Sequence, residues 1–135
     1  SDILSFLECV VSRNYVAIDF YDGSIMYDFV NGKTTICDID LFRKLPCVND
    51  MGHMWGSSRF QSPEEHQLGA DIDEITNVYT LGATAFALFG EYNRTREKWQ
   101  LSDKLFEIAT RAVSDDRTKR QQSIRKFTAE WEAAQ

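Results

Sequence analysis

Four aspartates lie on either side of a predicted β-hairpin. Asp19 and Asp22 precede the hairpin, and Asp38 and Asp40 follow it. Because a hairpin brings its two ends together, these carboxylates are expected to converge. Converging carboxylate oxygens suit a hard divalent cation such as Mg²⁺, which commonly binds one or two carboxylates together with substrate phosphates. Aspartate is also favoured in surface turns, so the spacing alone leaves both interpretations open.

Asp38 is the aspartate with the strongest indication of a chemical role. The residues around it in the sequence are apolar: Ile36, Cys37, Ile39 and Leu41. A carboxylate held among apolar side chains is costly unless it has a partner. This favours the use of Asp38 as a ligand over a simple role in a turn.

The elements that position these aspartates are predicted from local patterns. Apolar residues at helical spacing between Leu4 and Val11 predict a first helix that ends near Arg13 and Asn14. A short strand, 15–18, then leads to Asp19. The segments 25–29 and 34–37 are β-rich, and the Asn31-Gly32 pair between them is a strong signal for a hairpin turn.

The second half of the chain is predicted to be helical after a long irregular segment, 41–59. Such long loops within compact domains are usually functional. The run Ser62-Pro63-Glu64-Glu65 then predicts the start of a short helix, with an N-cap serine, a proline at the first position and a capping-box glutamate. A helix through 78–89 is apolar on nearly every face and is therefore expected to be buried. Two further helices are expected over 101–112 and 124–131.

Composition limits the classes of partner and environment. The chain has 135 residues and a net charge of -6, which predicts one domain and argues against nucleic-acid binding. Three cysteines at no zinc-like spacing suit reduced thiols in a cytoplasmic protein. The longest uncharged apolar stretch, Ile75–Gly90, is too short to span a bilayer, and the N-terminal residues do not form a secretory signal. We therefore expect neither a nucleic-acid nor a membrane partner.

The order of these segments resembles the large, C-terminal lobe of protein kinases over essentially the whole chain, 1–135. Ala17-Ile18-Asp19 stands where kinases have His-Arg-Asp, and Asp38-Ile39-Asp40 stands where they have Asp-Phe-Gly. The run from Gly56 to Glu64 is similar to the Gly-Thr-x-x-Tyr-x-Ala-Pro-Glu signature and is the most specific match. Asn77 to Gly82 is similar to Asp-Val-Trp-Ser-Leu-Gly. The resemblance implies a mainly α (α+β) fold, in which a helical bundle surrounds a buried central helix and a small β-hairpin lies near the catalytic loop.

The resemblance also implies roles for individual residues. Asp19 would be the catalytic residue that accepts or orients the hydroxyl proton of the acceptor. Asp38 would bind Mg²⁺ and the nucleotide, and Ser24 stands where kinases carry a second metal ligand, an asparagine. Asp40 replaces a glycine and is a third candidate metal ligand. The expected cofactors are ATP and Mg²⁺.

Three further residues would be structural. Glu64 in this family pairs with an arginine ahead of the last helix, and Arg120 stands at the corresponding place. Asn77 replaces an aspartate that holds the backbone of the catalytic loop. We expect Asn77 to keep this role, since an amide both donates and accepts hydrogen bonds.

Departures from the kinase pattern qualify the predicted activity. Ile18 replaces the arginine that receives an activating phosphate, and Tyr21 replaces a lysine. The chain contains neither Gly-x-Gly-x-x-Gly nor Val-Ala-Ile-Lys, so the missing kinase N-lobe is an expected partner and the fragment alone is predicted to be inactive. The uncovered face of the lobe is expected to cause self-association.

The predicted function is Mg-ATP-dependent phosphoryl transfer to a protein hydroxyl by a Ser/Thr-type kinase, once an N-lobe completes the lobe. One alternative is a pseudokinase or partner-binding module without turnover, favoured by Ala17, Ser24 and Asp40. A second alternative is a small-molecule kinase of the aminoglycoside or choline type, favoured by Asp40 alone.

Overall fold

The computed structural model describes residues 2–135 and contains four α-helices, six short strands and four 3₁₀ turns. In chain order these are α1 (Asp2–Ser12), β1 (Tyr15–Val16), η1 (Asp22–Ser24), β2 (Ile25–Asp28), β3 (Lys33–Ile36), β4 (Arg43–Lys44), β5 (Cys47–Val48), η2 (Pro63–His66), β6 (Asp71–Ile72), α2 (Glu74–Phe89), η3 (Arg96–Lys98), α3 (Asp103–Ala112), η4 (Arg117–Lys119) and α4 (Ile124–Ala133).

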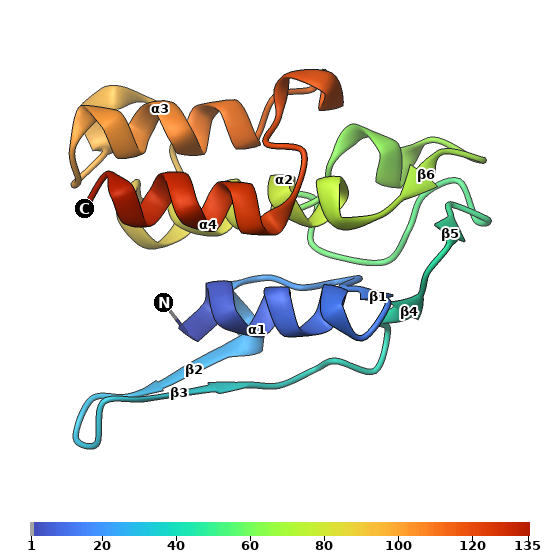
Figure 1. Cartoon of the computed structure of the whole chain (residues 1–135), viewed down its shortest axis with the longest axis horizontal. Coiled ribbons are helices and arrows are strands. Elements are labelled where there is room, and N and C mark those ends of the chain that lie inside the picture. Colours follow the sequence, from blue (N-terminus) through green and yellow to red (C-terminus); the bar gives the residue numbers. More distant parts are fainter. Residues whose placement is uncertain (1) are drawn as a thin grey trace.

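Helix α2 is the centre of the fold. It contacts α1, α3 and α4, and every residue from Thr76 to Phe86 is buried. Its start is fixed by the side chain of Asp73, which accepts a hydrogen bond from the Ile75 amide at 2.9 Å. Figure 1 shows α3 and α4 side by side above α1, with both chain termini at the same end. The expected bundle around a buried central helix is confirmed.

The predicted hairpin is confirmed, and its four-residue connection, 29–32, lies one position earlier than the predicted strands 25–29 and 34–37 indicate. Strands β2 and β3 pair antiparallel, so that Ile25 lies opposite Ile36 and Asp28 lies opposite Lys33. The Asp28 carboxylate accepts hydrogen bonds from the Val30 amide at 2.9 Å and the Asn31 amide at 3.2 Å. The turn therefore begins at Asp28 rather than at Asn31. Gly32 then adopts φ 61°. The hairpin extends away from the helices (Figure 1).

The prediction of an entirely irregular segment 41–59 was wrong at two places. Strand β4 pairs with β1, and β5 pairs with β6, each over two residues. Because β6 is a strand, the second half of the chain is also not wholly helical, and the first predicted strand, 15–18, keeps only Tyr15–Val16 in a ladder. Strands of two residues carry no alternating pattern, which is why periodicity did not reveal them.

Two apolar clusters hold these elements together. The larger cluster joins all four helices. The smaller one consists of Val16, Ile18, Met54 and Ile72, and it anchors β1 and β6 together with the loop that contains Met54. Ile18 is 3% exposed, so the apolar residue directly before Asp19 is part of this second core.

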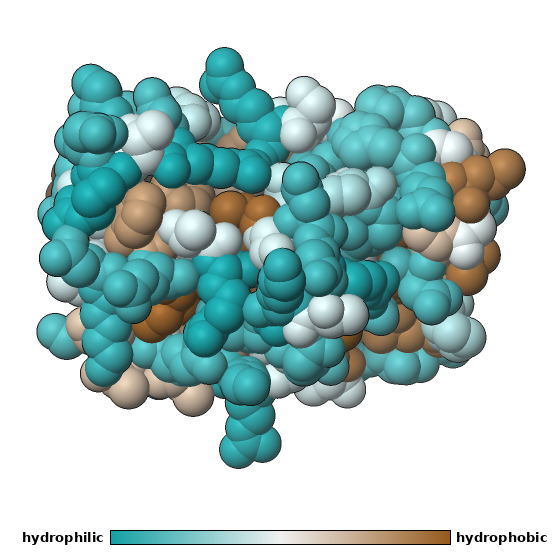
Figure 2. All heavy atoms as spheres, turned by 90° about the horizontal axis from the view of Figure 1, so that it is seen from above, coloured by the Kyte–Doolittle hydropathy of each residue, from teal (hydrophilic) through white to brown (hydrophobic). Residues whose placement is uncertain are grey.

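The surface is mostly hydrophilic over α3, as Figure 2 shows, while hydrophobic atoms gather at the end that holds β5 and β6. Large apolar side chains are also exposed on the hairpin, where Phe29 is 88% and Val30 is 93% exposed. Within residues 2–135 no helix has the length and apolar content needed to cross a lipid bilayer.

We predict that Gly82→Ala destabilises the fold by up to about 2 kcal/mol, although alanine favours helices. A Cβ at position 82 would lie 2.7 Å from Ala112 Cβ and 3.0 Å from the Ala109 carbonyl oxygen, so α2 and α3 would have to separate. Overpacking of this kind costs roughly 1–3 kcal/mol, against about 1 kcal/mol gained in helix propensity. Urea denaturation measures the difference. Ala129→Gly on the exposed face of α4 calibrates the propensity effect, and a stabilised Gly82→Ala variant would contradict the close packing.

Candidate functional site

The loop from Ala17 to Ser24, here called the Asp19 loop, is attached to the central helix. The Ala17 amide donates a hydrogen bond to Asn77 Oδ1 at 2.8 Å, and the Ala17 carbonyl accepts one from Asn77 Nδ2 at 2.7 Å. Asn77 is fully buried. The backbone two residues before Asp19 is therefore fixed by a side chain of α2, the contact that the kinase resemblance implies.

Asp19 lies at the meeting point of three segments. Its backbone has φ 55°, an uncommon conformation for a non-glycine residue that is found most often at turns and functional sites. Its half-buried side chain borders a small polar hollow that Ser57, Glu65 and Thr80 also line. At Gly56, an added Cβ would lie 3.3 Å from Asp19 Oδ1. The segment Gly56–Glu64, here called the Gly56 segment, therefore packs directly against Asp19.

Asp38 comes directly after Cys37, which is hydrogen-bonded to Ser24 at the end of the Asp19 loop. The Cys37 amide donates to the Ser24 carbonyl at 2.9 Å, which continues the hairpin pairing beyond Ile25 and Ile36. Asp38 has φ 56°. Asp38 and Asp40 are both exposed. The hairpin thus brings the Asp38 segment to Ser24.

The apolar surroundings expected for Asp38 are not present. Asp38 is exposed, and its neighbour Ile39 is 49% exposed. Strand β3 belongs to a two-stranded hairpin that is covered on one side at most, so residues that adjoin Asp38 in sequence do not enclose it. An exposed Asp38 carboxylate does not carry the desolvation cost that the sequence suggested. That cost is therefore no argument for a cation bound to Asp38.

Of the three expected metal ligands, Asp38 and Asp40 are exposed and Ser24 is buried. Ser24 is fully buried and its hydroxyl has no hydrogen-bond partner within the described chain, so it is not presented to a metal ion in this conformation. Within residues 2–135 no three His, Cys, Asp or Glu side chains form a metal-binding group. The exposed carboxylates of Asp38 and Asp40 match the one or two that Mg²⁺ commonly binds beside nucleotide phosphates.

Glu64 and Arg120 form a buried, bidentate ion pair. Arg120 Nη1 lies 2.6 Å from Glu64 Oε1, and Nη2 lies 3.0 Å from Oε2. The Arg120 guanidinium also lies 5.0 Å from the centre of the Tyr79 ring. Burial alone would raise the pKa of Glu64. The hydrogen bonds from Arg120, a backbone hydrogen bond and the positive charges of Arg120 and Arg117 together outweigh burial and hold this pKa below its ordinary value. This pair fixes the end of the Gly56 segment to the helices.

Glu65 is a buried acid that the sequence indicated only as a capping residue. Its Oε2 accepts hydrogen bonds from the Ser62 amide at 2.7 Å and the Ser62 hydroxyl at 2.9 Å. Burial raises its pKa to about 7, despite the lowering effect of these bonds. Because Glu65 lines the same hollow as Asp19, it is a further titratable group of the site. Only the capping-box position of Glu65 pointed to it, and that pattern does not reveal burial.

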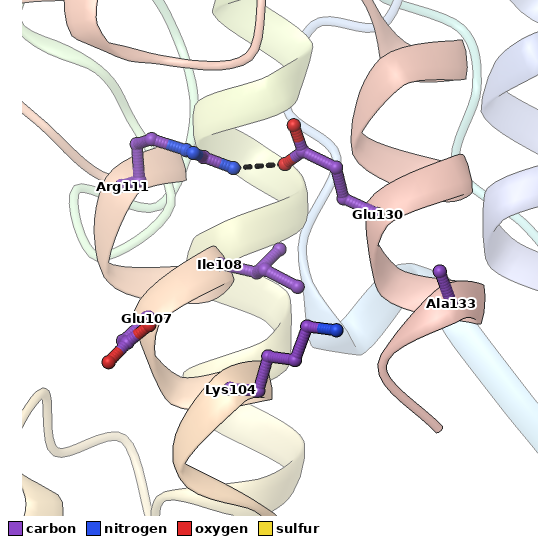
Figure 3. A pocket seen from close by; sticks show the side chains of 6 residues that line it. All are labelled: Lys104, Glu107, Ile108, Arg111, Glu130 and Ala133. Atoms are coloured by element: carbon purple, nitrogen blue, oxygen red, sulfur yellow. Dashed lines mark hydrogen bonds and ion pairs between the residues drawn. The ribbon is translucent and has the colours of Figure 1, made fainter.

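A second hollow lies between α3 and α4 and is separate from Asp19. It is lined by Lys104, Glu107, Ile108, Arg111, Glu130 and Ala133, as Figure 3 shows. The ion pair between Arg111 and Glu130 joins the two helices across it. Its two acids balance its two bases, and it shares no lining residue with the hollow at Asp19.

No protein-family model matches this sequence, and no curated protein matches it. A solved structure, described as the Cydia pomonella granulovirus kinase PK-1, superposes with a TM-score of 0.77 at 14% sequence identity. The fold is protein-kinase-like. The match covers 95% of this chain and 54% of the viral kinase, so this chain spans about half the length of that protein. The four helices and small antiparallel sheets correspond to a kinase-like C-lobe.

We predict that Arg120→Met lowers the free energy of unfolding by roughly 3–5 kcal/mol, because it leaves Glu64 as an uncompensated buried charge. Arg43 provides a matched control, since it forms an ion pair with Asp50 at 2.8 Å in which the Asp50 side chain is 62% exposed. Arg43→Met should cost at most about 1 kcal/mol. Chemical denaturation of both variants tests this, and equal losses would contradict a structural role specific to Arg120.

We predict that Glu65 makes the fold less stable as the pH rises. Its pKa is about 7 in the folded chain against an ordinary 4.5, so between these values the folded state holds a proton that the unfolded state has released. Stability is therefore lost as the pH increases through this window, by on the order of 3 kcal/mol in total. Glu64 has a lowered pKa, and its contribution changes only at more acidic pH.

Glu65→Gln should remove most of this pH dependence. Urea denaturation at pH 5 and pH 8 measures the slope for the wild type and the variant. Glu132→Gln on the exposed face of α4 should leave the slope unchanged. A slope that is equally steep in wild type and Glu65→Gln would exclude Glu65 as its source.

Proposed function

We propose that this chain is the C-terminal lobe of a protein-kinase-like phosphotransferase, which transfers a phosphoryl group from Mg-ATP to a Ser or Thr hydroxyl of a protein when joined to a nucleotide-binding lobe. The observation that carries the proposal is the convergence at Asp19. Asn77 holds the backbone before Asp19, and the Gly56 segment packs against its carboxylate. The protein-kinase-like fold supports the same conclusion.

In this proposal Asp19 orients the acceptor hydroxyl and accepts its proton. Phosphoryl transfer requires little covalent chemistry from the protein, so catalysis depends mainly on positioning and on stabilisation of charge. The two hydrogen bonds between Asn77 and Ala17 restrict the backbone that carries Asp19. The half-buried carboxylate retains an exposed part that an acceptor hydroxyl can approach.

Asp38 and Asp40 are the residues that would hold Mg²⁺. When bound, the ion would neutralise charge on the nucleotide phosphates. The exposed position of both carboxylates leaves room for phosphates to complete the coordination. The Cys37–Ser24 hydrogen bond fixes the start of this segment relative to the Asp19 loop.

A nucleotide-binding lobe would cover exposed apolar residues of the hairpin. Met26 is 61% and Tyr27 is 51% exposed, in addition to Phe29 and Val30 at the turn. Apolar side chains that gather on one protruding element indicate an interaction surface. Without a covering lobe, the same surface would promote self-association.

A partner-binding lobe without turnover is the second candidate function, and the position of Ser24 favours it. The Ser24 hydroxyl is buried rather than directed to solvent, so the Asp19 loop presents no side chain there as a second metal ligand. Such a lobe would keep the fold and the Glu64–Arg120 pair while losing phosphoryl transfer.

We predict that Asp19→Asn and Asp38→Asn each lower phosphate transfer by at least about 100-fold, because they remove the general base and a metal ligand respectively. The assay is transfer from radiolabelled Mg-ATP by the product of the complete gene. Asp71→Asn is the matched control, since Asp71 is an exposed carboxylate on β6 and should leave the rate unchanged.

Full activity of either variant would remove that residue from the mechanism. If the wild-type protein transfers no phosphate while a nucleotide-binding lobe is present, the phosphotransferase proposal fails and the partner-binding lobe replaces it.

A further inference from the structure

Two arginines with exposed side chains lie next to the Gly56 segment and are held together. Arg59 belongs to this segment, two residues after Ser57. Arg94 lies in the loop after α2, and its Nη2 donates a hydrogen bond to the Arg59 carbonyl at 3.2 Å. Both residues are exposed. The backbone of one cation is therefore fixed by the guanidinium of the other.

Each guanidinium also lies over a tyrosine ring. Arg94 lies 5.2 Å from the centre of the Tyr79 ring and donates from Nη1 to the Tyr79 hydroxyl at 3.0 Å. Arg59 lies 5.0 Å from the centre of the Tyr92 ring. A guanidinium has five N–H donors, and those that remain unused can bind a carboxylate or phosphate.

The tyrosine under Arg59 connects this pair of arginines to the Asp19 loop. The Tyr92 hydroxyl donates a hydrogen bond to Asp22, and this bond raises the pKa of Tyr92. Ser57 borders the hollow at Asp19, and two residues of extended chain span at most about 7 Å. When the acceptor hydroxyl of a polypeptide substrate reaches Asp19, another residue of that substrate, a few positions along its chain, would thus lie close to Arg59.

Neither arginine is neutralised by the protein. Among residues 2–135, the ion pairs do not include Arg59 or Arg94, although the chain has 21 acidic residues and 15 basic ones. Asp22 is the acidic side chain that touches this group, and it accepts the Tyr92 hydroxyl. Arg94 further borders an open hollow of about 510 Å³ that Arg111 and Lys119 also line, against one acid, Asp115.

We propose that Arg59 and Arg94 form a specificity site for an anionic side chain, a carboxylate or a phosphate, that lies within a few residues of the acceptor hydroxyl. This inference rests on the proposed function, because it takes the Gly56 segment as the surface that receives the acceptor. The substrate class is therefore an acidic polypeptide. The net charge of -6 would otherwise repel such a partner, so a local pair of fixed cations is needed to bind it.

Peptide binding to this chain tests the specificity site without requiring turnover. Four fluorescent peptides share one Ser-containing sequence and differ at a single position, the third after the serine. That position carries Asp, phosphoserine, Asn or Lys. Fluorescence anisotropy at low ionic strength should show the Asp and phosphoserine peptides binding at least roughly fivefold more tightly than the Asn peptide. The preference should weaken as salt screens the charges.

Arg59→Gln should abolish this preference, because it removes the charge. The exposed Arg59 side chain lies over the Tyr92 ring at the surface, so its replacement should not disturb folding. Arg94→Lys keeps the charge but loses the planar guanidinium and should reduce the preference. Arg125→Gln, which removes an exposed arginine of α4, is the control and should bind as the wild type does. Circular dichroism of each variant confirms that the helices remain.

The proposal is overturned if the Asn or Lys peptide binds as tightly as the acidic ones, or if Arg59→Gln keeps the full preference. Its failure differs from failure of the proposed function. A chain that prefers acidic peptides while the complete gene product transfers no phosphate keeps the specificity site and loses the phosphotransferase, whereas active protein without any acidic preference does the reverse.

Discussion

The two hydrogen bonds between Asn77 and Ala17 are the contact on which the candidate site depends. They satisfy a backbone N–H and a backbone C=O in the interior, where each unpaired group would cost roughly 1–3 kcal/mol. An asparagine amide matches this pair, because it accepts through Oδ1 and donates through Nδ2. An aspartate carboxylate at this position could accept only. The neutral side chain also places no charge in the core, so helix α2 can be buried on every side without a compensating cation.

Burial of α2 on all faces allows one helix to position two separate parts of the site. Asn77 and Tyr79 are two residues apart, which places them on nearly opposite sides of an α-helix. Asn77 holds the Asp19 loop, and the guanidinium groups of Arg94 and Arg120 lie 5.2 and 5.0 Å from the centre of the Tyr79 ring. Arg120 binds Glu64 and Arg94 binds the Arg59 carbonyl. The Gly56 segment is thus attached to α2 through Tyr79 while its start packs against Asp19.

Local patterns predicted the parts of the fold that depend on neighbours in sequence. The hairpin, the capped turn at Ser62 and the buried central helix all follow from short runs of residue types. The pairings of β1 with β4 and of β5 with β6 could not be predicted, since each joins two residues to a distant segment. Asp38 shows the same limit, because its apolar neighbours in sequence do not surround it in space. The kinase resemblance indicated the Glu64–Arg120 contact, but nothing in the sequence indicated that Glu65 is equally buried.

The positions of Ser24 and Asp40 change where a cation would be held. With the Ser24 hydroxyl buried, the Asp19 loop supplies no exposed ligand at that position, while Asp40 provides a second exposed carboxylate two positions after Asp38. Both candidate ligands then come from one segment instead of two. That segment is exposed, and its connection to the Asp19 loop is the hydrogen bond from Cys37 to Ser24. The pairing register of β2 and β3 therefore sets the position of the two proposed ligands, Asp38 and Asp40, relative to Asp19. A shift by one residue would move both along the hairpin and reverse the directions of their side chains.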